Sequence, residues 1–131
     1  MKKKIFFTLS VVLFLINISF AVSPPIDNHI KVDQFGYRNS DKKIAVISNP
    51  VTGYNNTNSF TPGSKYQVRR WSDDVVIYTG VISQWNGGAT QAQSGDKVWW
   101  FDFSSVNTPG IYYVCDSARN VRSYQFDVND N

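Results

Sequence analysis

One stretch, Lys97–Cys115, limits the possible folds of this chain more than any other. It contains two runs typical of β-strands, Val98–Phe103 and Ile111–Cys115, joined by a short polar connection. The first run is rich in aromatic residues, which favour a pleated, half-buried surface. The second run follows Pro109-Gly110, where proline fixes φ at about −65° and glycine is expected to supply the positive φ of a type II turn. Strand, corner and strand together predict an all-β fold.

The side-chain alternation of this stretch predicts which residues face the core. Successive side chains of a strand point to opposite faces. Trp99, Phe101 and Phe103 therefore form an aromatic row that we place in the core, and Trp100 falls on the outer face. Tyr112 lies just after the corner. This position is typical of a tyrosine corner, in which the hydroxyl bonds back to upstream backbone.

Period-2 patterning continues along the chain and predicts further strands. The expected strands lie at residues 29–34, 42–48, 66–72, 75–79 and 121–128. The last strand should place Tyr124, Phe126 and Val128 on one face. Asp73-Asp74 should form the turn of a hairpin rather than a calcium site, because a turn aspartate needs other oxygen ligands beside it.

Helices are expected to be nearly absent beyond residue 21, because no segment there has an apolar stripe of period 3.6. Residues 84–96 are too polar and too rich in glycine to predict a strand. About seven short strands separated by turns predict an immunoglobulin-like β-sandwich. We assign residues 29–128 to this domain and residues 22–28 to an extended leader.

The first 21 residues have the pattern of a secretory signal peptide, expected to be helical. Lys2-Lys3-Lys4 forms a positive n-region, Ile5–Ile18 is an apolar run, and Ala21 ends a cleavage site of small residues. A membrane anchor is the alternative, but a bilayer span needs about 20 apolar residues and this run is shorter. We therefore expect cleavage after Ala21, a secreted protein that is extracellular or periplasmic, and no membrane contact after cleavage.

Composition argues against several kinds of chemistry. Beyond residue 21, ten Lys and Arg balance ten Asp, so no net positive field supports nucleic-acid binding. His29 is the only histidine, which excludes histidine-based triads and multi-histidine metal sites, and we expect it to be a solvated surface residue. Cys115 is the only cysteine and is expected to be a small buried side chain. No metal or cofactor is expected.

Several segments carry a resemblance to a known family. His29–Tyr37, which ends in Gln-x-Gly-Tyr, precedes the lysine-led apolar run Lys42–Ile47. A second set follows: Val98-Trp99, then Asp102-Phe103-Ser104-Ser105, then Pro109-Gly110-x-Tyr112-Tyr113, and finally Tyr124–Val128. In this order and spacing the segments resemble the N-terminal immunoglobulin-like domain of family 9 cellulases, from about Ile30 to Val128.

The resemblance implies a role without chemistry of its own. In family 9 cellulases this domain precedes an (α/α)₆ catalytic barrel, which uses an aspartate to activate water and a glutamate as general acid. The chain contains no glutamate, so no catalytic residue is carried over and the chain alone is not expected to be an enzyme. Residues 129–131 would begin a linker. The chain would be a fragment of an endo-β-1,4-glucanase or a free-standing module.

Two functional hypotheses follow, and a third is weaker. The resemblance implies an accessory module that packs on a downstream (α/α)₆ catalytic domain of the same polypeptide and stabilises it. Large exposed aromatic residues concentrate at such surfaces, and the candidate contacts, to the barrel or to sugar, are Phe35, Tyr37, Trp85 and Trp100. The alternative is a carbohydrate-binding module for cellulose or a related β-glucan, using Trp71, Trp85 and Trp100. A cell-surface adhesion domain is the third reading.

Overall fold

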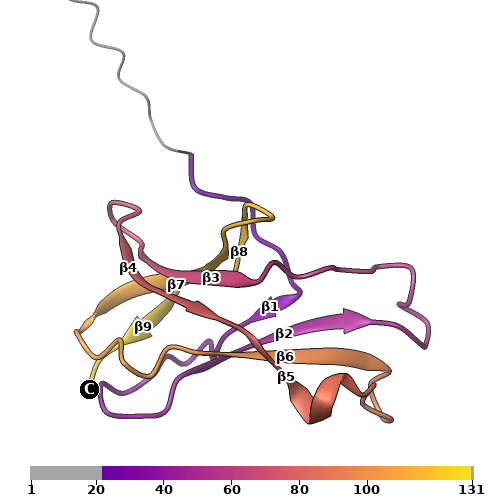
Figure 1. Cartoon of the computed structure of the whole chain (residues 1–131). Coiled ribbons are helices and arrows are strands. Elements are labelled where there is room, and N and C mark those ends of the chain that lie inside the picture. Colours follow the sequence, from indigo (N-terminus) through magenta and orange to yellow (C-terminus); the bar gives the residue numbers. More distant parts are fainter. Residues whose placement is uncertain (1–21, 131) are drawn as a thin grey trace, which may run out of the picture.

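The computed structural model describes residues 22–130 as two antiparallel sheets packed face to face (Figure 1). The signal peptide predicted for residues 1–21 lies outside the described residues. Within residues 22–130, no helix is long and apolar enough to cross a membrane. The expected immunoglobulin-like sandwich is confirmed. Residues 22–130 form nine strands instead of the expected seven or so, and three of them are only two residues long.

The strands divide between two sheets, named here by their central pairs. The β2–β6 sheet has the order β1-β2-β6-β5, with β1 (Ile30–Lys31), β2 (Ile44–Pro50), β6 (Asp96–Asp102) and β5 (Ser83–Gln84). The β3–β7 sheet has the order β4-β3-β7-β8 and pairs β9 with β7 as well. Its strands are β4 (Val76–Val81), β3 (Lys65–Arg70), β7 (Gly110–Asp116), β8 (Val121–Arg122) and β9 (Phe126–Val128).

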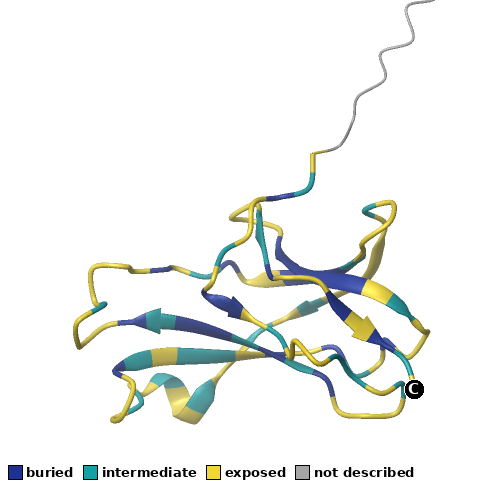
Figure 2. Ribbon diagram, turned by 180° about the vertical axis from the view of Figure 1, so that it is seen from behind, coloured by how far each residue is buried: buried dark blue, intermediate teal, exposed yellow. Residues whose placement is uncertain are grey.

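The core lies between the two sheets and follows the alternation of the strands (Figure 2). Phe101 and Phe103 are fully buried, whereas Trp100, which directly precedes Phe101, is 44% exposed. Trp99 is partly buried and packs against the core. The aromatic row and the outward Trp100 are therefore confirmed. The fully buried residues of β2, Ala45 and Ile47, face the same core.

The predicted hairpin is present. β3 pairs with β4 in antiparallel register, with a bulge between Val68 and Arg69. Asp74 adopts a φ of 61° in the turn, and its carboxylate accepts a hydrogen bond from Arg69. The left-handed conformation suits a short polar residue, because such a side chain can satisfy the turn locally.

Several boundaries differ from the sequence prediction. The strand expected over residues 29–34 is only Ile30–Lys31, and the one expected over residues 42–48 runs from Ile44 to Pro50. The strand expected over residues 121–128 is interrupted, so that β8 and β9 pair with different parts of β7. Phe126 and Val128 are buried as expected, but Tyr124 falls in the interruption and is 49% exposed. Gln84 was expected in a loop, yet it pairs with Trp99 as part of β5, before the 3₁₀ turn η1 (Trp85–Gly88).

Gly110 does not have the positive φ expected of a type II turn. Its role is spatial, because a Cβ at this position would lie 3.0 Å from the Tyr112 hydroxyl oxygen. That hydroxyl donates a hydrogen bond of 2.9 Å to the carbonyl oxygen of Thr108. The tyrosine corner is therefore confirmed, and the glycine makes room for it.

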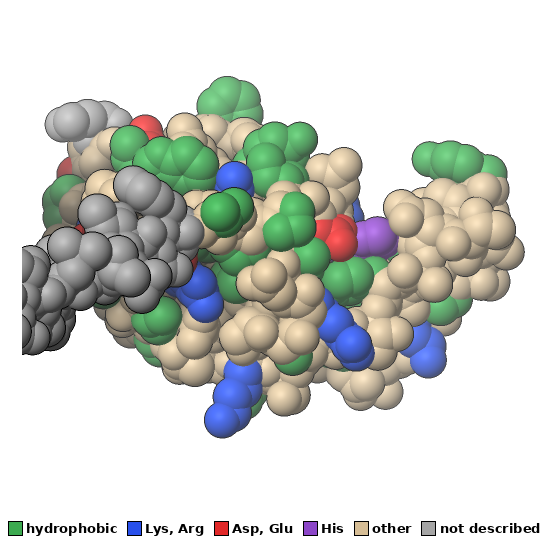
Figure 3. Space-filling view, turned by 90° about the horizontal axis from the view of Figure 1, so that it is seen from above, with side chains coloured by type: hydrophobic (Ala, Val, Ile, Leu, Met, Phe, Trp, Pro, Cys, Tyr) green, Lys and Arg blue, Asp and Glu red, His purple; other side chains and the backbone are tan. Residues whose placement is uncertain are grey.

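His29 was expected to be solvated, and this prediction is wrong. The imidazole is buried beside Phe60, with ring centroids 4.9 Å apart. Its Nδ1 lies 2.6 Å from the Asp27 carboxylate and its Nε2 lies 2.9 Å from the Asn58 carbonyl oxygen. The loop that contains Asn58, 29 residues away in sequence, thus packs against the histidine. Figure 3 shows the histidine at the base of a projecting lobe.

Candidate interaction surfaces

The C-terminus of the described chain lies at one end of the sandwich, where two loops also gather (Figure 1). We call this the C-terminal end; it comprises loop 33–41, connection 103–109 and β9. The Tyr37 amide donates to the Asp127 carbonyl oxygen at 2.8 Å, and the Asn129 amide donates to the Tyr37 carbonyl oxygen at 3.0 Å. Loop 33–41 is therefore bound to the last strand of the described chain.

Phe35 lies at the tip of this loop and is fully exposed. Its amide donates to the Asp33 carboxylate at 2.8 Å, which holds the turn. Gly36 follows with a φ of 88°, and a Cβ there would lie 2.8 Å from the Asp127 carbonyl oxygen. Only glycine allows the loop to approach the last strand this closely. Gly36 therefore determines where the loop that carries Phe35 lies.

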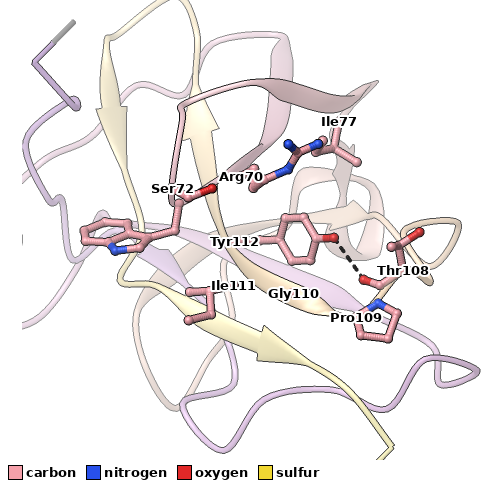
Figure 4. A pocket seen from close by; sticks show the side chains of 9 residues that line it. Arg70, Ser72, Ile77, Thr108, Pro109, Gly110, Ile111 and Tyr112 are labelled. Carbon is pink, nitrogen blue, oxygen red and sulfur yellow. Dashed lines mark hydrogen bonds between the residues drawn. The ribbon is translucent and has the colours of Figure 1, made fainter. Parts of the chain in front are cut away.

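An apolar groove of about 430 Å³ opens on the same side of the sandwich (Figure 4). It lies between the β3–β4 hairpin, which contributes Trp71 and Ile77, and the start of β7, which contributes Ile111. Gly110 and Ile111 pair with Val128 and Asp127 of β9. The groove therefore borders β9, the last strand of the described chain.

A buried lysine, which the sequence analysis did not single out, supports the C-terminal end from inside. Lys43 is completely buried, and its ammonium group donates to the carbonyl oxygens of Asn39 at 2.7 Å and Asp41 at 3.0 Å. Its backbone amide donates to Ser104 Oγ at 2.9 Å. One residue thus ties loop 33–41 to connection 103–109, and its lysine-led apolar context was the available sequence clue.

The outer face of the β2–β6 sheet forms a second surface. Lys31, Val46, Trp100 and Ser83 lie opposite one another across the four strands. Towards the far end of this face lies a polar cavity of about 270 Å³. Its lining residues are Asn28, His29, Lys31, Ser48, Pro50, Asn55, Asn58 and Asp96.

The three tryptophans proposed for sugar binding do not share a platform. Trp71 follows β3, and its ring contacts Tyr113 of the β3–β7 sheet at 6.2 Å. The Arg122 guanidinium covers that ring at 5.0 Å from its centroid. Trp100 points outward from the other sheet, and Trp85 is partly buried in η1 beside β6. One flat ligand therefore cannot stack on Trp71 and Trp100 together.

Ionisable groups in the described part of the chain show structural roles. Asp102 accepts hydrogen bonds from the Ser104 hydroxyl at 2.6 Å and amide at 2.9 Å, and these bonds lower the pKa of the carboxyl group. Burial raises the pKa of the Cys115 thiol. Within residues 22–130, no group of three or more His, Cys, Asp or Glu is placed to hold a metal ion.

Comparison with known proteins gives the family. The model of the cellulase N-terminal Ig-like domain matches residues 26–120. The chain belongs to this family. A comparison with curated protein sequences gives no match.

The solved structures similar to this cellulase N-terminal domain are much longer proteins. A metagenome-derived glycoside hydrolase family 9 endoglucanase is 29% identical with a TM-score of 0.60, over 76% of this chain and 18% of the endoglucanase. A family 9 protein from Bacteroides ovatus has a TM-score of 0.58 over 78% of this chain and 16% of its own, at 21% identity, and shares the fold. The endoglucanase J30 is 25% identical with a TM-score of 0.53, over 70% and 14%. This chain therefore spans less than a fifth of these relatives.

The motif residues of the cellulase N-terminal domain meet in space. The Tyr37 ring packs edge-on against both Phe103 and Phe126, with centroids 5.3 Å apart in each case. Its hydroxyl donates to the Ile44 carbonyl oxygen at 3.1 Å and accepts from the Asp33 amide at 3.0 Å. Of the four predicted contact residues, Tyr37 thus packs on the core, Trp85 is partly buried, and Phe35 and Trp100 are exposed; a contact role for the four stays a prediction.

Proposed function

We propose that this chain is the non-catalytic N-terminal module of a secreted family 9 glycoside hydrolase, and that it packs on the catalytic domain and stabilises it. The contact surface is the C-terminal end, where Phe35 and the groove beside Ile111 both lie next to the last strand. The parent enzyme is an endo-β-1,4-glucanase acting on cellulose or a related β-glucan. The family match and the partial coverage of endoglucanases support this proposal.

The proposed contact surface rests on one observation, the position of Phe35 on a loop that is hydrogen-bonded to the end of the last strand. The phenyl ring of Phe35 is fully exposed, and aromatic residues are enriched at protein interfaces. Two backbone hydrogen bonds hold this loop on Asp127 and Asn129, so Phe35 has a fixed place beside the last described residues. We therefore expect a catalytic domain that follows this module to contact Phe35.

The test uses the full-length polypeptide that contains this chain. Phe35→Ser should lower the melting temperature of the catalytic domain by about 2 °C or more, because it removes an apolar contact. Tyr54→Ser is the matched control, since Tyr54 is equally exposed and lies in the loop after β2. Equal melting of wild type and Phe35→Ser would contradict the proposed surface, and a gene without a catalytic region would contradict the proposed role.

Secretion is part of the proposal and rests on the signal-peptide pattern of residues 1–21. Mass spectrometry of the protein recovered from the culture medium or periplasm should give an N-terminus at Val22. Retention of residues 1–21 in that fraction would contradict cleavage after Ala21.

A further inference from the structure

We propose that the outer face of the β2–β6 sheet binds a neutral oligosaccharide, held in the polar cavity beside Lys31 and Asp96 and stacked on Trp100. This site is separate from the C-terminal end and needs no catalytic domain. It also differs from the three-tryptophan platform, because only Trp100 of that set contributes.

The register of the sheet brings the polar groups of the cavity together. Ala45 and Ile47 of β2 face the core, so Ser48 and Pro50 lie on the opposite, outer face. Pro50 pairs with Asp96, which places this aspartate on the outer face of β6. Lys31 of β1 reaches the same side, and its ammonium group donates to Ser48 Oγ at 2.5 Å. Three strands thus supply a cation, a hydroxyl and a carboxylate to one cavity.

One of the residues that line the cavity has an oxygen without a hydrogen-bond partner. Asp96 Oδ1 is buried and has no hydrogen-bond partner within the described structure. A buried polar atom without a partner costs free energy. A turn of the Asp96 side chain towards the cavity that it lines would let a ligand hydroxyl satisfy this oxygen. Burial also lowers the pKa of Lys31, while the carboxylates of Asp96 and Asp27 partly oppose that effect. Lys31 and Asp96 therefore bring opposite charges to the lining of one cavity.

The lining chemistry fits the hydroxyl groups of a neutral sugar. The ammonium group of Lys31 donates and the carboxylate of Asp96 accepts, and the amide groups of Asn55 and Asn58 can do both. Because the cation is already balanced by a carboxylate, an anionic sugar gains no net attraction. A small number of convergent polar groups in a concave site is the usual arrangement for orienting a small ligand.

Trp100 extends the site along the same face. Asp96 and Trp100 are four residues apart on one strand, which separates them by about 13 Å. Trp100 is 44% exposed, and the residues opposite it in the ladder, Val46 and Ser83, have short side chains. A single sugar cannot reach both ends of this distance, so the ligand is an oligosaccharide.

The test is a nuclear magnetic resonance titration of ¹⁵N-labelled residues 22–131, the segment that contains the whole core. Cellohexaose at millimolar concentration should shift the Trp100 indole resonance and the side-chain amide resonances of Asn55 and Asn58. Trp100→Ala and Asp96→Asn should each weaken binding about tenfold or more, because each removes a direct contact. Trp100→Tyr should keep most of the affinity, and Val81→Thr, on the edge of the other sheet, should bind as wild type.

The outcomes separate this site from the docking role. No shift on this face with cellohexaose would overturn the proposal, and that mapping needs no variant to fold. Equal affinity of wild type, Trp100→Ala and Asp96→Asn would overturn it as well. Binding of pentagalacturonate in place of cellohexaose would overturn the assignment of a neutral ligand. The domain is measured alone, so none of these results depends on a catalytic domain.

Discussion

The hydroxyl of Tyr112 donates a hydrogen bond of 2.9 Å to the carbonyl oxygen of Thr108, four residues upstream. This bond fixes the corner between connection 103–109 and β7, and it lies in the wall of the apolar groove (Figure 4). The corner therefore stabilises the fold and shapes the C-terminal end at the same time.

Tyr112→Phe should lower the free energy of unfolding by about 1 kcal/mol, because it removes one hydrogen bond and keeps the buried ring. Urea denaturation followed by tryptophan fluorescence measures the change. Tyr124→Phe is the control, and this half-exposed tyrosine should give a change below about 0.5 kcal/mol. Equal stability of Tyr112→Phe and wild type would show that the corner bond adds nothing.

Asp116→Ala should destabilise the domain by roughly 3 kcal/mol or more, because it leaves several amides unpaired. The completely buried carboxylate accepts from the amides of Gly63 at 2.7 Å, Ala118 at 3.0 Å and Arg119 at 3.1 Å. Thermal and urea unfolding measure the loss, with the exposed Asp127→Ala as control. A loss no larger than that of the control would contradict this role.

Cys115 should be inert towards thiol reagents in the folded protein, since it is fully buried and burial raises its pKa. Ellman's reagent at pH 8 should react slowly in buffer and rapidly in urea. The raised pKa contributes stability below the ordinary thiol pKa of about 8.5, and this stability is lost as the pH rises through the folded-state value. Cys115→Ala should therefore flatten the alkaline loss of stability; rapid labelling of folded protein would refute the assignment.

Asp102 gives the opposite pH dependence. The two hydrogen bonds from Ser104 hold its pKa below the ordinary value, so its stabilising effect is present above pH of about 4 and is lost as the pH falls through the folded-state pKa. The stability difference between wild type and Asp102→Asn should be small and should shrink on acidification. A difference that grows below pH 4 would have the wrong sign for this account.

The sequence allowed the sandwich, its aromatic row and the tyrosine corner to be predicted, because each depends on contacts or alternation within one short segment. Trp100 and Phe101 fall on opposite faces because they are neighbours in a strand. His29 failed because its burial depends on Phe60 and Asn58, which reach it only after the chain has folded. Alternation alone also placed Tyr124 wrongly, since it cannot show where pairing stops.

The candidate surfaces were harder to predict than the core. The cavity combines Lys31, Ser48 and Asp96 from three strands, and only the register of those strands brings them together. The position of Phe35 beside the last strand likewise depends on a long-range hydrogen bond, from the Tyr37 amide to the Asp127 carbonyl oxygen. Composition could list these residues, but it could not show that they meet.

Amide hydrogen exchange tests the central claim, that the C-terminal end contacts a catalytic domain, most directly. The measurement compares residues 33–41 and 104–111 in the isolated domain and in the full-length polypeptide, with loop 51–60 as the internal reference. The account predicts slower exchange of the first two segments in the full-length polypeptide and unchanged exchange of the reference loop. Identical exchange of residues 33–41 and 104–111 in both proteins would contradict it.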